Sequence, residues 1–388
     1  MRFTRSIRPT LRSRRAQVLA GMLAVSFAVA GPLHLFAPAR AKAHVNTGPV
    51  QVGISFSPRR TDALGLDYQV AFKRLEALHF RVIRLSAYWS EIDSNGYDRL
   101  DWLMTEARQS HQSVVLTVGM KGLGWPEFYV PDALVPEGGF HDGQDLGSEP
   151  ALDAAALVFV RYTVERYRLN QALVAWQVEN EPFNRSGPNR LWVDGSFLKQ
   201  EIATLKSLDR HRPVIVNAFT HFNLIVDQAS DRNGFNVGEL LGFDTDGAER
   251  DSLSALGKRD ILGLDVYTAI GYQLLGQNHV SRADADWPDR LERLRGLAEK
   301  QGKQAWIMEA QAEPWEASYT TLASPLSITP KDIAANFATL KDAGYTTILL
   351  WGSEYWLWRA DHGDSRWVDT VKSVLAQEAA APAISLPA

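Results

Sequence analysis

Eight short apolar segments alternate with helical segments between residues 50 and 375, and this alternation constrains the fold more than any other feature. Each apolar segment is rich in residues that favour strands. Their starts are 32, 32, 60, 40, 47, 44 and 42 residues apart, so every interval has room for a crossover helix and a loop. The eight strand candidates are 50–56, 82–87, 114–118, 174–178, 214–218, 261–267, 305–308 and 347–350.

Between and after these strands, apolar residues recur with helical spacing at 68–78, 100–107, 154–167, 197–208, 291–298, 333–340 and 368–375. Eight consecutive β/α units predict an α/β fold, a single (β/α)8 TIM barrel with long loops at its C-terminal face, over residues 44–378. An open doubly wound sheet is the alternative, but it would place a glycine-rich phosphate loop after the first strand. Gly53-Ile54-Ser55-Phe56 is no such loop.

Two long intervals contain few strand or helix signals. Residues 119–150 are rich in Gly and Pro, and we expect them to form a loop over the mouth of the barrel. Residues 227–251 are predicted to be a second, polar insertion, and residues 379–388 a flexible tail of small residues.

The first 43 residues differ from the rest of the chain and predict an N-terminal export signal. They hold eight basic residues and no acidic one, followed by an apolar stretch at 16–30 and the small-x-small site Ala41-Lys42-Ala43. The protein is therefore expected in the periplasm or outside the cell. An uncleaved membrane anchor is the alternative, although the apolar stretch is shorter than the ~20 residues that a spanning helix needs.

Charge and composition exclude several kinds of function. Without the eight basic residues of 1–43, 33 of the 41 Lys and Arg remain against 45 Asp and Glu, a balance of −12 that disfavours nucleic acid. The chain has no cysteine, which excludes disulfides, thiolate metal sites and a thiol nucleophile. Its nine histidines include no pair at ligand spacing, so we predict neither a metal nor a cofactor.

Two glutamates stand where apolar strands end. The run Trp176-Gln177-Val178-Glu179-Asn180-Glu181-Pro182 passes from a strand to a proline that cannot continue it, and Glu309 directly follows the strand at 305–308. In a TIM barrel the carboxyl ends of the strands line the active site, so Glu181 and Glu309 should face one pocket. Glycosidic bond cleavage requires a pair of carboxyl groups, and a separation of about 5 to 5.5 Å indicates the covalent, retaining route.

The Trp-Gln-Val-Glu-Asn-Glu-Pro run on the fourth strand, the glutamate on the seventh and the tryptophan on the eighth resemble clan A glycoside hydrolases, the cellulase-like retaining glycosidases. The resemblance covers nearly the whole chain after the signal. It implies that Glu181 is the acid/base and Glu309 the nucleophile. It further implies four substrate-binding residues. Asn180 would bind the 2-hydroxyl of the sugar, Arg84 and Tyr267 would support the nucleophile, and Trp351 would be the aromatic platform under the sugar.

The residues themselves support part of this assignment. Arg84 lies inside the apolar strand 82–87, where a buried guanidinium needs a carboxylate partner, and Glu309 is the expected one. That pairing should lower the pKa of Glu309 and keep it ionised. Glu179, together with the incoming sugar, could supply the setting that favours a protonated Glu181.

Cellulase-like members carry histidines at two places where this chain departs from the pattern. Gly119 and Lys121 stand near the end of the third strand, and Asp265 stands two residues before Tyr267. Rival carboxylates further past the strand ends are Glu127, Glu313 and Glu354. The aromatic residues after Trp351, Trp356 and Trp358, are expected on a loop that stacks sugars.

These observations predict an exported retaining glycoside hydrolase that cleaves a β-linked oligosaccharide or polysaccharide by double displacement. A transglycosylase of envelope glycans on the same site, and a catalytically silent carbohydrate-binding barrel, are the alternatives. The sequence leaves open the glycan and its linkage, endo or exo action and the oligomeric state.

Overall fold

The computed structural model of the 388-residue chain describes residues 48–223, 247–317 and 322–380. The predicted export signal lies outside these residues, as does most of the predicted polar insertion; its last residues begin helix α10. Helix α14 runs to Ala380, two residues into the segment predicted as a tail, and the rest of that segment is not described. No helix within the described parts of the chain combines the length and apolarity that crossing a membrane requires.

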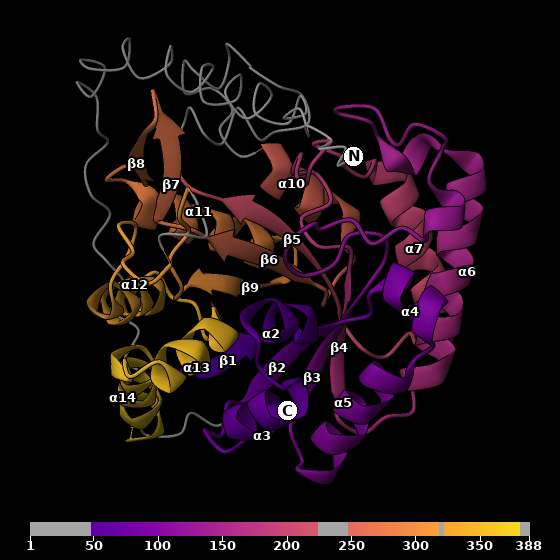
Figure 1. The fold of residues 1–388 in the computed structure, drawn as a ribbon. Coiled ribbons are helices and arrows are strands. Elements are labelled where there is room, and N and C mark those ends of the chain that lie inside the picture. Colours follow the sequence, from indigo (N-terminus) through magenta and orange to yellow (C-terminus); the bar gives the residue numbers. More distant parts are fainter. Residues whose placement is uncertain (1–47, 224–246, 318–321, 381–388) are drawn as a thin grey trace, which may run out of the picture.

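Eight parallel strands close into a barrel in the order β1-β10-β9-β6-β5-β4-β3-β2, and helices surround it (Figure 1). This confirms the predicted single (β/α)8 barrel. The strands are β1 (Gln51–Ser55), β2 (Val82–Ser86), β3 (Val114–Val118), β4 (Leu173–Val178), β5 (Val214–Thr220), β6 (Ile261–Val266), β9 (Gln304–Gln311) and β10 (Thr347–Trp351).

The α-helices of the described chain match the predicted segments and add four short ones. Every predicted segment lies within a helix or overlaps most of one. The seven are α3 (Tyr68–Glu76), α5 (Asp98–Gln109), α6 (Pro150–Tyr167), α7 (Gly195–Leu208), α11 (Trp287–Lys300), α12 (Pro330–Asp342) and α14 (Arg366–Ala380). The added helices are α2 (Pro58–Leu64), α4 (Trp89–Asn95), α10 (Gly247–Ala255) and α13 (Ser353–Asp361).

The structure differs from the prediction at three places. A two-stranded antiparallel hairpin, β7 (Ala269–Leu274) and β8 (Gln277–Arg282), follows β6 outside the barrel. Strand β9 continues to Gln311, so Glu309 lies within the strand and does not end it. Trp356 belongs to α13, is fully buried and donates its indole N–H to the Ala312 carbonyl at 2.7 Å, so it packs in the core and stacks no sugar.

The barrel interior contains an apolar layer and, two residues further along the strands, a polar layer. Side chains at alternate positions of a strand point to the same side, so both layers face inward. The apolar layer closes the lower part of the barrel, and the polar layer forms the floor of the mouth. The pairs are Val82 and Arg84 on β2, Ala175 and Gln177 on β4, and Ile215 and Asn217 on β5.

Candidate active site

Three carboxyl groups meet above this polar layer. One oxygen each from Glu181, Asp265 and Glu309 lies within 4.8 Å of the other two, and all three residues are buried. Glu181 follows β4 and Glu309 lies on β9, two strands that β5 and β6 separate on one side of the barrel. The structure thus brings the two predicted glutamates together and adds Asp265.

The backbone after β4 aims neighbouring glutamates in different directions. Glu179 and Glu181 both have left-handed φ angles, 57° and 48°, which are uncommon in residues other than glycine and cost energy. The carboxylate of Glu179 accepts hydrogen bonds from the backbone N–H groups of Met120 and Lys121, at 2.8 and 2.6 Å. Glu179 therefore contacts the β3 loop, and it is not a member of the carboxyl cluster that Glu181 forms with Asp265 and Glu309.

The backbone N–H of Glu181 donates to Asn217 Oδ1 at 2.8 Å, which fixes the residue above β5. Its carboxylate accepts a hydrogen bond from Asn184 Nδ2 at 3.0 Å. Lys121, fully buried, donates to the Glu181 carbonyl at 2.8 Å and places its Nζ 3.7 Å from the Glu181 carboxylate. Lys121 thus places a positive charge beside Glu181. The sequence analysis noted this residue only as a departure from the family pattern.

Glu309 is held from two sides. Arg84 donates from Nη2 to one carboxylate oxygen and Tyr267 donates its hydroxyl to the other. Ser55 Oγ accepts from Arg84 Nε at 2.9 Å and orients the guanidinium. The predicted partnership of Arg84 with Glu309 is present, and Tyr267 completes it.

The pKa of Glu309 differs from the sequence prediction. Burial raises it to about 7, and the negative charge of Glu181 acts in the same direction. The Arg84 guanidinium and the Tyr267 hydrogen bond lower it without offsetting the loss of solvation. The predicted lowered pKa is therefore wrong, because the site is drier than a strand end exposed to solvent.

Asn180 is fixed in one orientation by the polar layer. Its side-chain oxygen accepts hydrogen bonds from Asn217 Nδ2 at 2.8 Å, Gln177 Nε2 at 3.2 Å and Arg84 Nη1 at 3.4 Å. The amide nitrogen is itself a donor and cannot accept from three N–H groups. These contacts therefore show which end of the Asn180 amide is the oxygen and which is the nitrogen. The amide nitrogen of Asn180 donates to no residue in the described parts of the chain and is available to a ligand.

A cavity of about 600 Å³ opens above the carboxylates, and aromatic side chains line it. Trp125 and Trp315 are 62% and 41% exposed, and Trp351 is half-buried with its indole N–H on Glu313 at 3.0 Å. Tyr267 packs edge-on against Trp315, with ring centroids 4.9 Å apart. Partly exposed indoles around buried carboxylates offer flat apolar faces to a ring-shaped polar ligand.

The rival carboxylates are engaged elsewhere. Glu313 pairs with Arg60 at 3.0 Å, and Glu354, at the start of α13, accepts from the Ser57 backbone N–H. Glu127 lies 3.3 Å from Lys121 Nζ at the edge of the cavity. None of the three joins the cluster around Glu309.

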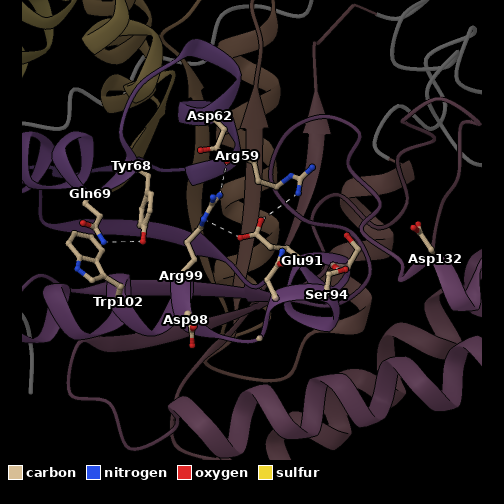
Figure 2. Close-up of a pocket in the computed structure, with 13 residues that line it drawn as sticks. Arg59, Asp62, Tyr68, Gln69, Glu91, Ser94, Asp98, Arg99, Trp102 and Asp132 are labelled. Carbon is tan, nitrogen blue, oxygen red and sulfur yellow. Dashed lines mark hydrogen bonds and ion pairs between the residues drawn. The ribbon is translucent and has the colours of Figure 1, made fainter.

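Figure 2 shows a larger hollow, of about 870 Å³. Arg59 lines both this hollow and the cavity. Its walls carry ion pairs, Arg99 with Asp62 at 2.8 Å and with Glu91 at 3.3 Å, and Arg59 with Glu91 at 3.5 Å. The two arginines of this hollow are held in ion pairs, and its remaining carboxylates, Asp98 and Asp132, are exposed to solvent. It therefore lacks the buried, unbalanced groups that chemistry requires. The smaller cavity is the candidate active site.

Asp265, Asn217, Gln177 and Lys121 complete the site, and the sequence analysis assigned a role to none of them. Asn217 and Gln177 are polar residues inside apolar strands, the same signal that drew attention to Arg84. Among the described residues, one cluster of carboxyl groups is compact enough to hold a metal ion. It consists of Glu181, Asp265 and Glu309. Arg84 already balances Glu309, and no histidine belongs to the group, so these residues fit a metal poorly.

A second pair of buried glutamates lies behind β4. Glu179 and Glu201 are fully buried, and neither carboxylate oxygen of Glu201 has a hydrogen-bond partner within the described chain. Burial raises both pKa values, that of Glu179 to about 7, and the charge of Glu179 raises the pKa of Glu201 further. Raised pKa values mean that the folded chain binds protons more tightly than the unfolded chain between pH 4.5 and about 7. The free energy of unfolding therefore falls as pH rises through this window.

We expect Glu201→Gln to remove much of this pH dependence. At pH 5 the variant should be about as stable as the wild type, because glutamine is uncharged, as a protonated Glu201 is. At pH 8 it should be more stable than the wild type, because it has one buried carboxyl group fewer to ionise. Urea unfolding at both pH values measures the difference, and exposed Glu165→Gln on α6 is the matched control. A pH-independent difference between Glu201→Gln and the wild type would contradict a raised pKa of Glu201.

The fold and the site define a (β/α)8 barrel with buried glutamates from the fourth and seventh barrel strands at its mouth. No family model and no curated protein sequence matches the chain. Solved structures with this fold include the cold-adapted β-galactosidase from Rahnella sp. R3, at 13% identity, with a TM-score of 0.54 over 86% of this chain and 56% of that one. A GH5_18 protein from Streptomyces cattleya matches at 12% identity, with a TM-score of 0.53 over 87% and 82%.

The exo-β-1,4-mannosidase Op5Man5 from an Opitutaceae bacterium is similar at 13% identity, with a TM-score of 0.52 over 81% of this chain and 55% of that one. The chain thus spans little more than half of the β-galactosidases it matches. The matched structures, which include β-galactosidases and a mannosidase, share the fold of this chain and confirm the predicted barrel.

Proposed function

We propose that the protein is a retaining glycoside hydrolase that acts on a β-linked glycan. Glu309 attacks the anomeric carbon, and Glu181 first donates a proton to the leaving oxygen and then accepts one from the incoming water. The observation that carries the proposal is the approach of the Glu181 and Glu309 carboxylates to within 4.8 Å at the floor of an aromatic-lined cavity. Solved structures of the same fold carry the names of β-galactosidases and a mannosidase.

The carboxylate separation favours retention over inversion. Inverting enzymes hold their two carboxyl groups about 6.5 to 9.5 Å apart, because a water must fit between the base and the sugar. The distance here leaves no such room and suits direct attack by Glu309. Arg84 and Tyr267 orient both oxygens of that carboxylate, so its attacking lone pair has a fixed direction.

Neighbouring groups fit the parts of a bound sugar. The free amide nitrogen of Asn180 can donate to a hydroxyl next to the reacting carbon, an interaction that strengthens in the transition state. Trp351 offers a face to the sugar ring, and Trp125 and Trp315 extend apolar surface along the cavity.

A panel of aryl β-glycosides that differ in the sugar tests the function. The wild-type protein should release the phenol from at least one of them, and nuclear magnetic resonance should show the β-anomer as the first product. An added sugar acceptor separates hydrolysis from transglycosylation, since a transglycosylase passes the glycosyl group to the acceptor in preference to water. Glycan binding without turnover of any substrate in the panel would contradict the proposal and favour a catalytically silent carbohydrate-binding barrel.

We also propose that residues 1–43 direct export, on the basis of their basic and apolar composition. N-terminal sequencing of protein from the producing cell should find a mature chain that begins just after Ala43. Recovery of the intact N-terminus in the membrane fraction would favour the anchor instead.

A further inference from the structure

Asp265 is a third buried carboxyl group in the site, and the double displacement does not use it. It lies on β6 in register with Glu309 on β9, and its side chain is 0% exposed. A residue so deeply placed below the cavity cannot touch a sugar. Any effect of Asp265 on catalysis must therefore act through Glu309 or Glu181.

The charges around Asp265 do not balance without a proton. Arg84 pairs with Glu309, and Lys121 lies 3.7 Å from the carboxylate of Glu181. Asp265 forms no ion pair with either cation, and its neighbours Glu309, Glu181 and Tyr267 are acidic groups. Three negative charges within 4.8 Å of one another in a dry site repel strongly, which favours protonation of the one without a cation.

Hydrogen bonds identify the oxygen that would carry this proton. Asn217 Nδ2 donates to Asp265 Oδ2 at 2.5 Å, so Oδ2 is an acceptor. The other oxygen, Oδ1, accepts no hydrogen bond within the described chain, and the carboxyl groups of Asp265 and Glu181 come within 4.8 Å of each other. Burial raises the pKa of Asp265 well above its usual range, and the charges of Glu309 and Glu181 raise it further.

We propose that Asp265 is a neutral carboxylic acid that donates a hydrogen bond from Oδ1 to Glu181 and acts as a positioning residue for the acid/base. The inference rests on the proposed function and deepens it. A hydrogen bond from a neutral acid is stronger to a carboxylate than to a protonated carboxyl group. Asp265 therefore stabilises Glu181 as it loses its proton to the leaving group, and Asp265 keeps its own proton throughout.

An isosteric variant tests whether Asp265 acts as a neutral hydrogen-bond donor. In Asp265→Asn, the amide oxygen can accept from Asn217 and the amide nitrogen can donate to Glu181, as the neutral acid does. We expect kcat/KM at pH 6 to stay within about threefold of the wild type. Asp265→Ala lacks the donor and should lose about 10- to 100-fold, the effect of one hydrogen bond to a charged group.

The pH profile gives a readout that a merely structural role would not move. An amide is a weaker hydrogen-bond donor than a carboxylic acid, so Asp265→Asn should stabilise the ionised form of the acid/base less than the wild type does. The alkaline limb of its kcat/KM profile should move upward relative to the wild type. Equal losses in Asp265→Asn and Asp265→Ala, or an unmoved alkaline limb, would overturn the proposal.

Infrared spectroscopy tests the proton without any substrate. At pH 7 the wild type should show the C=O stretch of a protonated carboxylic acid that persists in Glu201→Gln and disappears in Asp265→Asn. An unchanged spectrum in Asp265→Asn would overturn the inference, whether or not the protein hydrolyses glycosides. If no glycoside is cleaved but the band behaves as expected, the proposed function fails and the neutral carboxylic acid stands.

Discussion

Replacing Glu309 by glutamine is expected to lower kcat/KM by about 10⁴-fold, or about 5 kcal/mol of transition-state stabilisation at 1.36 kcal/mol per tenfold. The amide cannot form the glycosyl ester, so the covalent route is lost. Arg84 and Tyr267 would both remain, so the fold around the site should persist. Initial rates on the best substrate of the panel measure the loss.

Glu127→Gln is the matched control, because Glu127 lies in the same cavity and the substitution makes the same change of a carboxyl group to an amide. It should lose less than tenfold. A loss below about tenfold for Glu309→Gln would remove Glu309 from the role of nucleophile, and a larger loss for Glu127→Gln than for Glu309→Gln would move that role to Glu127.

Replacing Glu181 by alanine should produce a loss that depends on the leaving group. General acid catalysis contributes about 10²- to 10⁴-fold, so glycosides of poor leaving groups should lose rate in that range. A nitrophenolate can leave without being protonated. Nitrophenyl glycosides should therefore lose far less rate in the first step. Their glycosyl-enzyme intermediate should accumulate, because Glu181 no longer activates water.

Azide provides the complementary measurement for Glu181→Ala. A small anion can occupy the space of the missing carboxylate and attack the intermediate without base catalysis. We expect added azide to restore turnover of nitrophenyl glycosides and to yield a β-glycosyl azide. The same loss for good and poor leaving groups, with no response to azide, would show that Glu181 is not the acid/base.

The repeat of strands and helices made the barrel predictable, because eight apolar segments with crossover-sized spacing leave few topologies. The same repeat placed Glu181 and Glu309 at the mouth, since strand ends in a barrel share one rim. Arg84 was predictable for another reason: a buried guanidinium requires a carboxylate, and the strand that carries Arg84 ends at the mouth, where Glu309 also lies.

Other features depend on geometry that the sequence does not encode locally. Left-handed φ angles at Glu179 and Glu181 turn one side chain to the β3 loop and the other to the cavity, and no residue pattern announces them. The raised pKa of Glu309 follows from burial by the whole mouth. Trp356 was expected on a sugar-stacking loop, but a short helix packs it into the core.

Covalent trapping tests the central claim most directly. The protein is incubated with an activated 2-deoxy-2-fluoro β-glycoside of the sugar that the panel identifies, digested and examined by peptide mass spectrometry. Attack by Glu309 predicts a stable adduct of one fluoroglycosyl unit on the peptide that contains Glu309, and none in Glu309→Gln. An adduct on another residue, or no adduct from a substrate whose parent glycoside is hydrolysed, would contradict the account.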